Sequence, residues 1–167
     1  MFMKSNQDPS KHARSAVAIA LAVLSLVTFS PTAAPAGAKS VARGRYLVRI
    51  TGCNDCHTDG YMAAGGKVDE AQWLTGSPLG WQGPWGTTYA ANLRLALQRY
   101  TLDEWLRMAR EPRRPPMPWF ALRDMTDEDL SSIYQYIRSL GPAGAEAPAF
   151  LPPGQPARTP VVRMPAG

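Results

Sequence analysis

The sequence predicts an all-α fold, and two observations carry that prediction. Three segments repeat apolar residues at the three- and four-residue spacing of an amphipathic helix, and no segment shows the sustained alternation of a strand. Glycine and proline together make up 30 of the 167 residues, so we expect long loops between the helices. A coiled coil, a repeat solenoid and a fully disordered chain do not fit this composition.

The first 38 residues have the pattern of a secretory signal peptide. Lys4, Lys11 and Arg14 precede an apolar run, Ala16–Phe29, and the small residues around Ala38 offer a cleavage site. An uncleaved membrane anchor is the alternative, although the run has 14 residues and a membrane-spanning helix needs about 20. Cleavage would remove three basic residues and one acid, which lowers the net charge from +5 to +3. We therefore expect a periplasmic protein that touches a membrane only if the leader stays, and no nucleic-acid binding.

The first expected helix of the exported part runs from a Ser40 cap to about Thr51, where a glycine ends it. Residues 58–92 then contain nine glycines and prolines and three tryptophans, which predicts long ordered loops with a short helix near Glu70. A further short helical stretch is expected over residues 93–100. Loops of this length inside a small domain need something to pack against.

The second and third helices have clearer ends. The capping box Thr101–Glu104 begins the second helix, and Pro112 ends it. The third runs over residues 126–140, from a threonine cap followed by three acidic residues to a Gly-Pro pair. Residues 39–140 are thus the expected folded domain, and residues 141–167 form a proline-rich tail that is either an extended strap or disordered.

The motif that carries chemistry is Cys53-Asn54-Asp55-Cys56-His57. Its Cys-x-x-Cys-His spacing is the attachment signature of a c-type haem. Two thiols on one tight turn can add to the two vinyl groups of the porphyrin, and His57 is then carried beneath the ring, where its imidazole can bind the iron. Export agrees with this interpretation, because bacteria attach haem covalently outside the cytoplasm.

Three other interpretations of these cysteines compete. A structural zinc site wants four ligands, but the only other histidine is His12 in the leader. A thioredoxin-like redox pair would sit in a βαβ pattern, which the sequence does not show. A simple disulfide between Cys53 and Cys56 would leave His57 unexplained.

The chain resembles the single-haem class I c-type cytochromes of the bacterial periplasm. The resemblance covers roughly residues 40–140 and rests on Gly52–His57, a proline-flanked methionine and a last helix containing Tyr134–Ile137. It implies a cytochrome c-like fold, in which the first and last helices cross and one covalent haem c sits in a loop-lined crevice. Gly44 and Tyr136 fall where that crossing pairs a small residue with an aromatic one.

The same resemblance implies a methionine as the second iron ligand, and Met117 fits best. Arg114-Pro115-Pro116-Met117-Pro118-Trp119 is a stiff, non-helical strap, because proline fixes its own φ and keeps its predecessor extended. The strap lies just before the last helix, where the family usually places its axial methionine. The alternatives within the exported part are Met62, Met108, Met125 and Met164.

Aromatic side chains are candidates for the walls of the crevice, where they would hydrogen-bond the haem propionates; ordinary packing is the alternative. They are Trp81, Trp85, Tyr89 and Trp119. Asn92 is a candidate donor to a propionate or to a loop. A backbone carbonyl near Pro78 or Pro84 is expected to accept from the second nitrogen of His57.

The resemblance implies a single-electron carrier without catalytic residues, which docks transiently with redox partner proteins. The alternatives are an electron-accepting cytochrome subunit of a periplasmic dehydrogenase or oxidase complex, and a haem enzyme acting on a small sulfur species or peroxide. Arginines concentrated near Met117 would steer the chain toward an acidic partner, unless they form an ordinary solvated face. They are Arg94, Arg99, Arg107, Arg110, Arg113 and Arg114.

Overall fold

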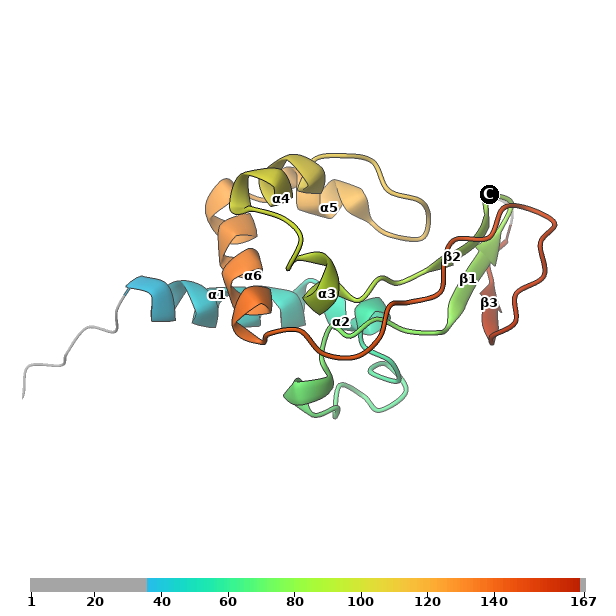
Figure 1. Ribbon diagram of the computed structural model, residues 1–167, viewed down its shortest axis with the longest axis horizontal. Coiled ribbons are helices and arrows are strands. Elements are labelled where there is room, and N and C mark those ends of the chain that lie inside the picture. Colours follow the sequence, from blue (N-terminus) through green and yellow to red (C-terminus); the bar gives the residue numbers. More distant parts are fainter. Residues whose placement is uncertain (1–35, 166–167) are drawn as a thin grey trace, which may run out of the picture. The chain divides into compact units, whose positions relative to one another are not determined.

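Two helices, α1 (Ala36–Ile50) and α6 (Asp127–Ser139), cross each other in this computed structural model, which describes residues 36–165 (Figure 1). Gly44 lies at the crossing. A Cβ atom there would come within 2.0 Å of the Ser132 carbonyl oxygen and 2.7 Å of the Tyr136 Cβ. Only a glycine allows this approach, so the predicted pairing of Gly44 with Tyr136 is confirmed.

The core fills the angle between these two helices and α4 (Leu102–Ala109). Trp105 of α4 is buried and donates its indole N–H to the Leu130 carbonyl at 2.9 Å, which joins α4 to α6. The side chains of the core that are less than 3% exposed are Val48, Leu74, Leu97, Ala109, Leu130, Ile133, Tyr136 and Ile137.

The predicted helix caps are confirmed at two of three places. Thr101 and Glu104 form a reciprocal capping box at the start of α4. Thr126 accepts from the Asp129 N–H at 3.1 Å and begins α6. The Ser40 cap is wrong, because α1 begins four residues earlier and the Ser40 hydroxyl instead lies 3.2 Å from the Ser132 hydroxyl on α6.

Four shorter helical elements connect the long ones: α2 (Cys53–His57), the 3-10 turn η1 (Glu70–Gln72), α3 (Leu93–Ala96) and α5 (Trp119–Asp124). The expected turns near Glu70 and over residues 93–100 are therefore present. The sequence did not predict α5, because six residues are too few to show a helical period and proline precedes them.

A small sheet was not predicted either. β1 (Gly80–Gly83) pairs antiparallel with β2 (Gly86–Tyr89) and parallel with β3 (Val161–Arg163), in the order β2-β1-β3. Strands of three and four residues are too short for alternation to be recognised. β3 belongs to the proline-rich tail, which is thus an extended strap: it leaves α6, passes α3 and joins the sheet (Figure 1).

The predicted signal peptide lies outside the described residues, apart from residues 36–38, which begin α1. Within residues 36–165, no helix is long and apolar enough to cross a membrane.

Candidate functional site

α2 presents Cys53, Cys56 and His57 on one short turn, so the structure brings together the three residues predicted to attach haem. Gly52 makes the turn possible. It joins α1 to α2 with a φ of +75°, in the left-handed region that glycine adopts without strain. A Cβ atom there would also lie 3.1 Å from an Asp55 carboxylate oxygen.

Both thiols of this turn are free and partly buried. Burial raises the pKa of Cys53 and of Cys56 above the usual value for a thiol, so both carry their proton at neutral pH. The Thr51 hydroxyl lies 3.4 Å from the Cys53 sulfur. Two unpaired thiols, rather than a disulfide, are what thioether attachment requires.

The His57 ring is held by one main-chain group. Its Nδ1 lies 2.7 Å from the Ala91 carbonyl oxygen, and a carbonyl can only accept, so Nδ1 carries the proton. Burial lowers the pKa of His57 below 6.5, which favours the neutral ring despite the opposing effect of the Ala91 carbonyl. The Nε2 lone pair is thereby left for a metal.

The acceptor for His57 was expected near Pro78 or Pro84, and that expectation is wrong. Just before Pro78 the chain is bonded to α2, because the Gly76 N–H donates to the His57 carbonyl at 2.8 Å. The Ser77 N–H donates to the Ala90 carbonyl at 3.3 Å, which brings the segment containing Ala91 to the ring. A carbonyl leaves no signal in the sequence, since every residue has one.

Two polar residues beside the motif support it and were missed. The buried Thr58 hydroxyl donates to the Asn54 side-chain oxygen at 2.7 Å and accepts from the Leu74 N–H at 2.8 Å. These bonds tie α2 to the loop that follows it. Their positions in the sequence could have indicated this role, because Asn54 lies inside the motif and Thr58 directly follows His57.

Met117 lies in the loop between α4 and α5, where it is partly buried. Residues 112–118 of this loop are non-helical, as predicted for the proline-rich strap. The Met117 N–H donates to the Arg114 carbonyl at 3.3 Å, and the Met117 carbonyl accepts from the Trp119 N–H at 2.8 Å. Local main-chain bonds and flanking prolines therefore restrict the backbone that carries the thioether.

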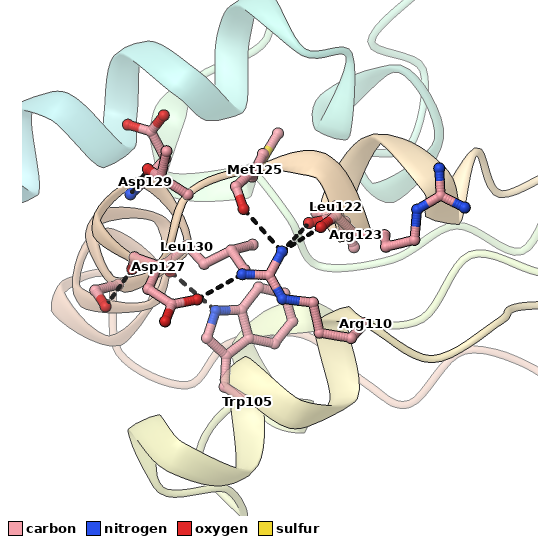
Figure 2. A network of polar contacts seen from close by, with 10 residues as sticks. Trp105, Arg110, Leu122, Arg123, Met125, Asp127, Asp129 and Leu130 are labelled. Carbon is pink, nitrogen blue, oxygen red and sulfur yellow. Dashed lines mark hydrogen bonds and ion pairs between the residues drawn. The ribbon is translucent and has the colours of Figure 1, made fainter.

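Arg110, at the end of α4, bonds to the main chain at the end of α5 (Figure 2). Its guanidinium donates to the carbonyls of Leu122 and Met125, at 3.4 and 2.7 Å, and to that of Arg123. It also pairs with Asp127 at the start of α6. A cation is well placed at the carbonyl end of α5. These bonds hold the end of α4 against the end of α5, on either side of the segment that contains the Met117 loop.

The aromatic residues predicted to line a crevice lie on two separate parts of the chain. Trp81 is in β1, and Trp85 in the hairpin turn covers Gly83, whose Cβ would come within 2.5 Å of the indole ring. Tyr89 ends β2 and accepts from the Thr159 hydroxyl at 3.2 Å. Trp119 begins α5. Within residues 36–165, no hydrogen bond or ring contact joins these aromatic residues, so their role as walls stays a prediction.

Two of the six arginines proposed to steer a partner are structural instead. Arg94 is 6% exposed and donates to the carbonyls of Gly141, Ala71 and Leu140, so the prediction is wrong for it. Arg110 closes the Met117 loop. Arg99 pairs with Glu146 on the surface. The exposed arginines that remain near Met117 are Arg107, Arg113 and Arg114.

The groups present on this site fit haem c. They are two free thiols on one turn and an imidazole whose Nδ1 is already bonded. One buried side-chain donor of the motif, Asn54 Nδ2, finds no hydrogen-bond partner among residues 36–165. Unpaired buried donors are rare, and Asn54 lies inside the attachment motif itself. A polar, covalently held cofactor accounts for such groups better than an apolar core does.

Comparison with known proteins identifies the family. The cytochrome c family model matches residues 41–141. The fructose dehydrogenase cytochrome subunit of Gluconobacter japonicus is 33% identical over 133 residues, which cover 71% of this chain and 25% of that protein. A nicotinate dehydrogenase subunit of Pseudomonas putida is 28% identical over 123 residues, 67% of this chain and 10% of that protein. No solved structure matches the chain significantly.

The chain thus spans a quarter of the length of the first relative and a tenth of the second. The family match nevertheless covers more than half of the chain, with the Cys53–His57 motif, most of α1 and all of α6. The crossing of α1 with α6 and the mostly helical architecture agree with it. The chain therefore belongs to the cytochrome c family, and it is an electron carrier with covalently bound haem rather than an enzyme.

Proposed function

We propose that this protein carries one haem c, joined to Cys53 and Cys56, with His57 and Met117 as its two axial ligands, and that it transfers single electrons outside the cytoplasm. The chain has two cysteines and one Cys-x-x-Cys-His motif, which supports a single haem. The observation that carries the proposal is the 2.7 Å bond from His57 Nδ1 to the Ala91 carbonyl, on the turn that presents both thiols.

Met117 as the second ligand is supported by the way its loop is held. The loop is restricted by proline inside and closed by Arg110 at its base, so its thioether has little freedom to move away from a partner. Other methionines are less suited: Met62 is 53% exposed on the loop that directly follows the haem motif, and Met108 lies within α4.

When bound, the haem iron supplies the redox chemistry by alternating between its ferric and ferrous forms. The chain's residues set how readily this happens. A methionine ligand and burial both raise the reduction potential. With His57 and Met117 both bound to the iron, no position would remain for substrate or oxygen, and electron transfer of this kind would require no general base or nucleophile.

The partner proposed here is a dehydrogenase that gives up electrons to this chain. Both relatives named above are subunits of dehydrogenases. The first candidate is a free carrier, which docks transiently with the dehydrogenase. Its exposed arginines near the Met117 loop would attract it to an acidic surface of that enzyme; they are Arg107, Arg113 and Arg114. The second candidate is a permanent subunit of such a complex, which the names of the relatives favour.

The proposal is tested on protein produced with its own leader in a bacterium that attaches haem. The intact mass of the purified protein is expected to equal the chain without residues 1–38 plus one haem, and a redox titration to show a single one-electron wave. A variant with Cys53→Ala and Cys56→Ala serves as the matched control without attachment sites. Mature parent protein without covalent haem, or with more than one, would contradict the proposal.

The two partnership candidates are separated by the protein's size in native extract. A free carrier elutes at the mass of one chain. A subunit elutes together with a dehydrogenase, and its haem becomes reduced when the substrate of that enzyme is added.

A further inference from the structure

We propose that the C-terminal tail, through residues 143–145, holds Asn92 and so positions the Ala91 carbonyl that accepts from His57. Asn92 and the tail are positioning residues in this account. The inference rests on the proposed function, since it concerns His57 as an iron ligand. Residues 143–145 follow the family-matched region, residues 41–141, so this support comes from a part of the chain outside the family match.

The Asn92 side chain is fully buried and makes three hydrogen bonds. Its Oδ1 accepts from the Leu95 N–H at 3.1 Å and caps α3. Its Nδ2 donates to the Ala143 carbonyl at 2.7 Å and to the Ala145 carbonyl at 3.1 Å. Each amide hydrogen thus has a tail carbonyl as its acceptor. Because Ala91 precedes Asn92 in the chain, fixing Asn92 also limits how far the Ala91 carbonyl can turn.

Two glycines allow the neighbouring segments to approach Asn92 closely. A Cβ atom on Gly76 would come within 2.9 Å of the Asn92 nitrogen and 3.0 Å of the Ala90 oxygen. A Cβ atom on Gly144 would come within 3.2 Å of Asn92 Nδ2 and 3.1 Å of the Thr75 Cβ. Residues 90–92 are therefore in close contact both with the segment that follows the haem motif and with the tail.

The tail is itself anchored on both sides of this contact, so it can serve as a support. Before it, Arg94 donates to the Gly141 carbonyl at 2.6 Å and to that of Leu140. After it, Thr87 and Leu151 exchange two main-chain hydrogen bonds of 2.8 and 3.0 Å. β3 then pairs with β1, and Figure 1 shows the tail running from the end of α6 to the sheet.

The expected effect on the reduction potential has a definite sign. A strong bond from His57 Nδ1–H to a carbonyl makes the imidazole a better donor, which stabilises the ferric form and lowers the potential. Loosening the Ala91 carbonyl should therefore raise the potential. Simple loosening of the fold would expose the haem to water, which favours the ferric charge and lowers the potential. The sign separates a positioning role from a merely structural one.

Three variants of the full chain test the proposal. Asn92→Ser keeps a hydroxyl that can cap α3 but is too short to reach both tail carbonyls. Gly144→Ala places a methyl group against Asn92 at a φ of +73°. Gly154→Ala is the matched control in the same tail, because its φ is +85° and no atom lies within 4 Å of the added methyl group. It carries the same left-handed strain without touching Asn92.

The readouts on haem-loaded protein are the exchange rate of the His57 Nδ1 proton by NMR and the reduction potential. Asn92→Ser and Gly144→Ala are expected to speed exchange about tenfold and to raise the potential, while Gly154→Ala changes neither. An unchanged or lowered potential in both test variants would overturn the inference. Parent protein whose His57 resonances show no coordination to iron would instead overturn the proposed function, and the inference with it.

Discussion

The Arg110 guanidinium donates to the Met125 carbonyl with 2.7 Å between Nη1 and the oxygen, and this bond closes the loop that carries Met117. Figure 2 shows the same guanidinium facing the carbonyls of Leu122 and Arg123 and the carboxylate of Asp127. One side chain thus joins the end of α4 to the end of α5 and the start of α6. These bonds lie on either side of the segment that carries Met117, the proposed iron ligand.

Replacing Arg110 should loosen that ligand without removing it. In Arg110→Gln the carbonyls at the end of α5 lose their cation, so the Met117 loop opens more often and added imidazole should bind the ferric iron about tenfold faster. Stopped-flow mixing measures the rate. Arg107→Gln, on the exposed side of the same helix, is the control and should bind imidazole at the parent rate. Equal rates for both variants would show that Arg110 does not restrain Met117.

A methyl group at the helix crossing should destabilise the fold. Gly44→Ala puts a Cβ 2.0 Å from the Ser132 carbonyl oxygen, so α1 and α6 must move apart, at a cost of about 3 kcal/mol in unfolding free energy. Helix propensity alone predicts the opposite sign, a gain of about 1 kcal/mol. Denaturant unfolding decides between them. Ala42→Gly, at an exposed position of α1, measures the propensity effect by itself.

Arg94 within α3 and Arg99 just after it should differ sharply in their contribution to stability. Arg94 is buried with three carbonyl acceptors, so Arg94→Met leaves the end of α6 without its donors and should cost about 3 kcal/mol. Arg99→Met removes only an exposed pair with Glu146 and should cost less than about 1 kcal/mol. Thermal unfolding of both variants at matched haem content checks the difference; similar losses would refute it.

Acid should weaken the junction between η1 and the crossing helices. Arg45 holds the pKa of Glu70 below 4.5, and Tyr136 donates its hydroxyl to the same carboxylate at 2.7 Å. A lowered pKa means that this stabilisation is complete above pH 4.5 and is lost as the pH falls through the folded-state pKa. Because Glu70 is partly exposed, the effect is limited to about 1 kcal/mol.

Glu70→Gln tests that dependence. Its unfolding free energy should lie below that of the parent at pH 7, and the difference should shrink between pH 5 and pH 3. A constant difference across that range would assign the loss to packing rather than to the charge.

Much of the fold could be predicted because its determinants are local. The Thr101–Glu104 capping box and the Thr126 cap act within one helical turn, and both were identified correctly. The crossing of Gly44 with Tyr136 came from the family resemblance and is confirmed by their close approach. Ser40 shows the limit of such rules, because a serine inside a helix and a serine that caps one look alike in the sequence.

The parts of the site that could not be predicted depend on which segments, distant in the sequence, lie next to His57 and Met117 in the fold. The acceptor for His57 is a main-chain oxygen 34 residues away, and no side chain in the sequence indicates which main-chain oxygen it is. Asn92 was noted as a donor, but its acceptors lie more than 50 residues further on, in the tail. Arg94 and Arg110 looked like surface charges until their carbonyl acceptors were placed. The three strands were not predicted, because three or four residues are too few to show the alternation of apolar and polar side chains that marks a strand.

The near-infrared absorption of the oxidised, haem-loaded protein tests the central claim most directly, since a methionine bound to ferric haem gives a characteristic charge-transfer band there. The band should be present in the parent and in Met62→Ala, whose residue is 53% exposed, and absent in Met117→Ala. A band that survives in Met117→Ala, or that the parent lacks, would contradict the assignment of His57 and Met117 as the axial pair.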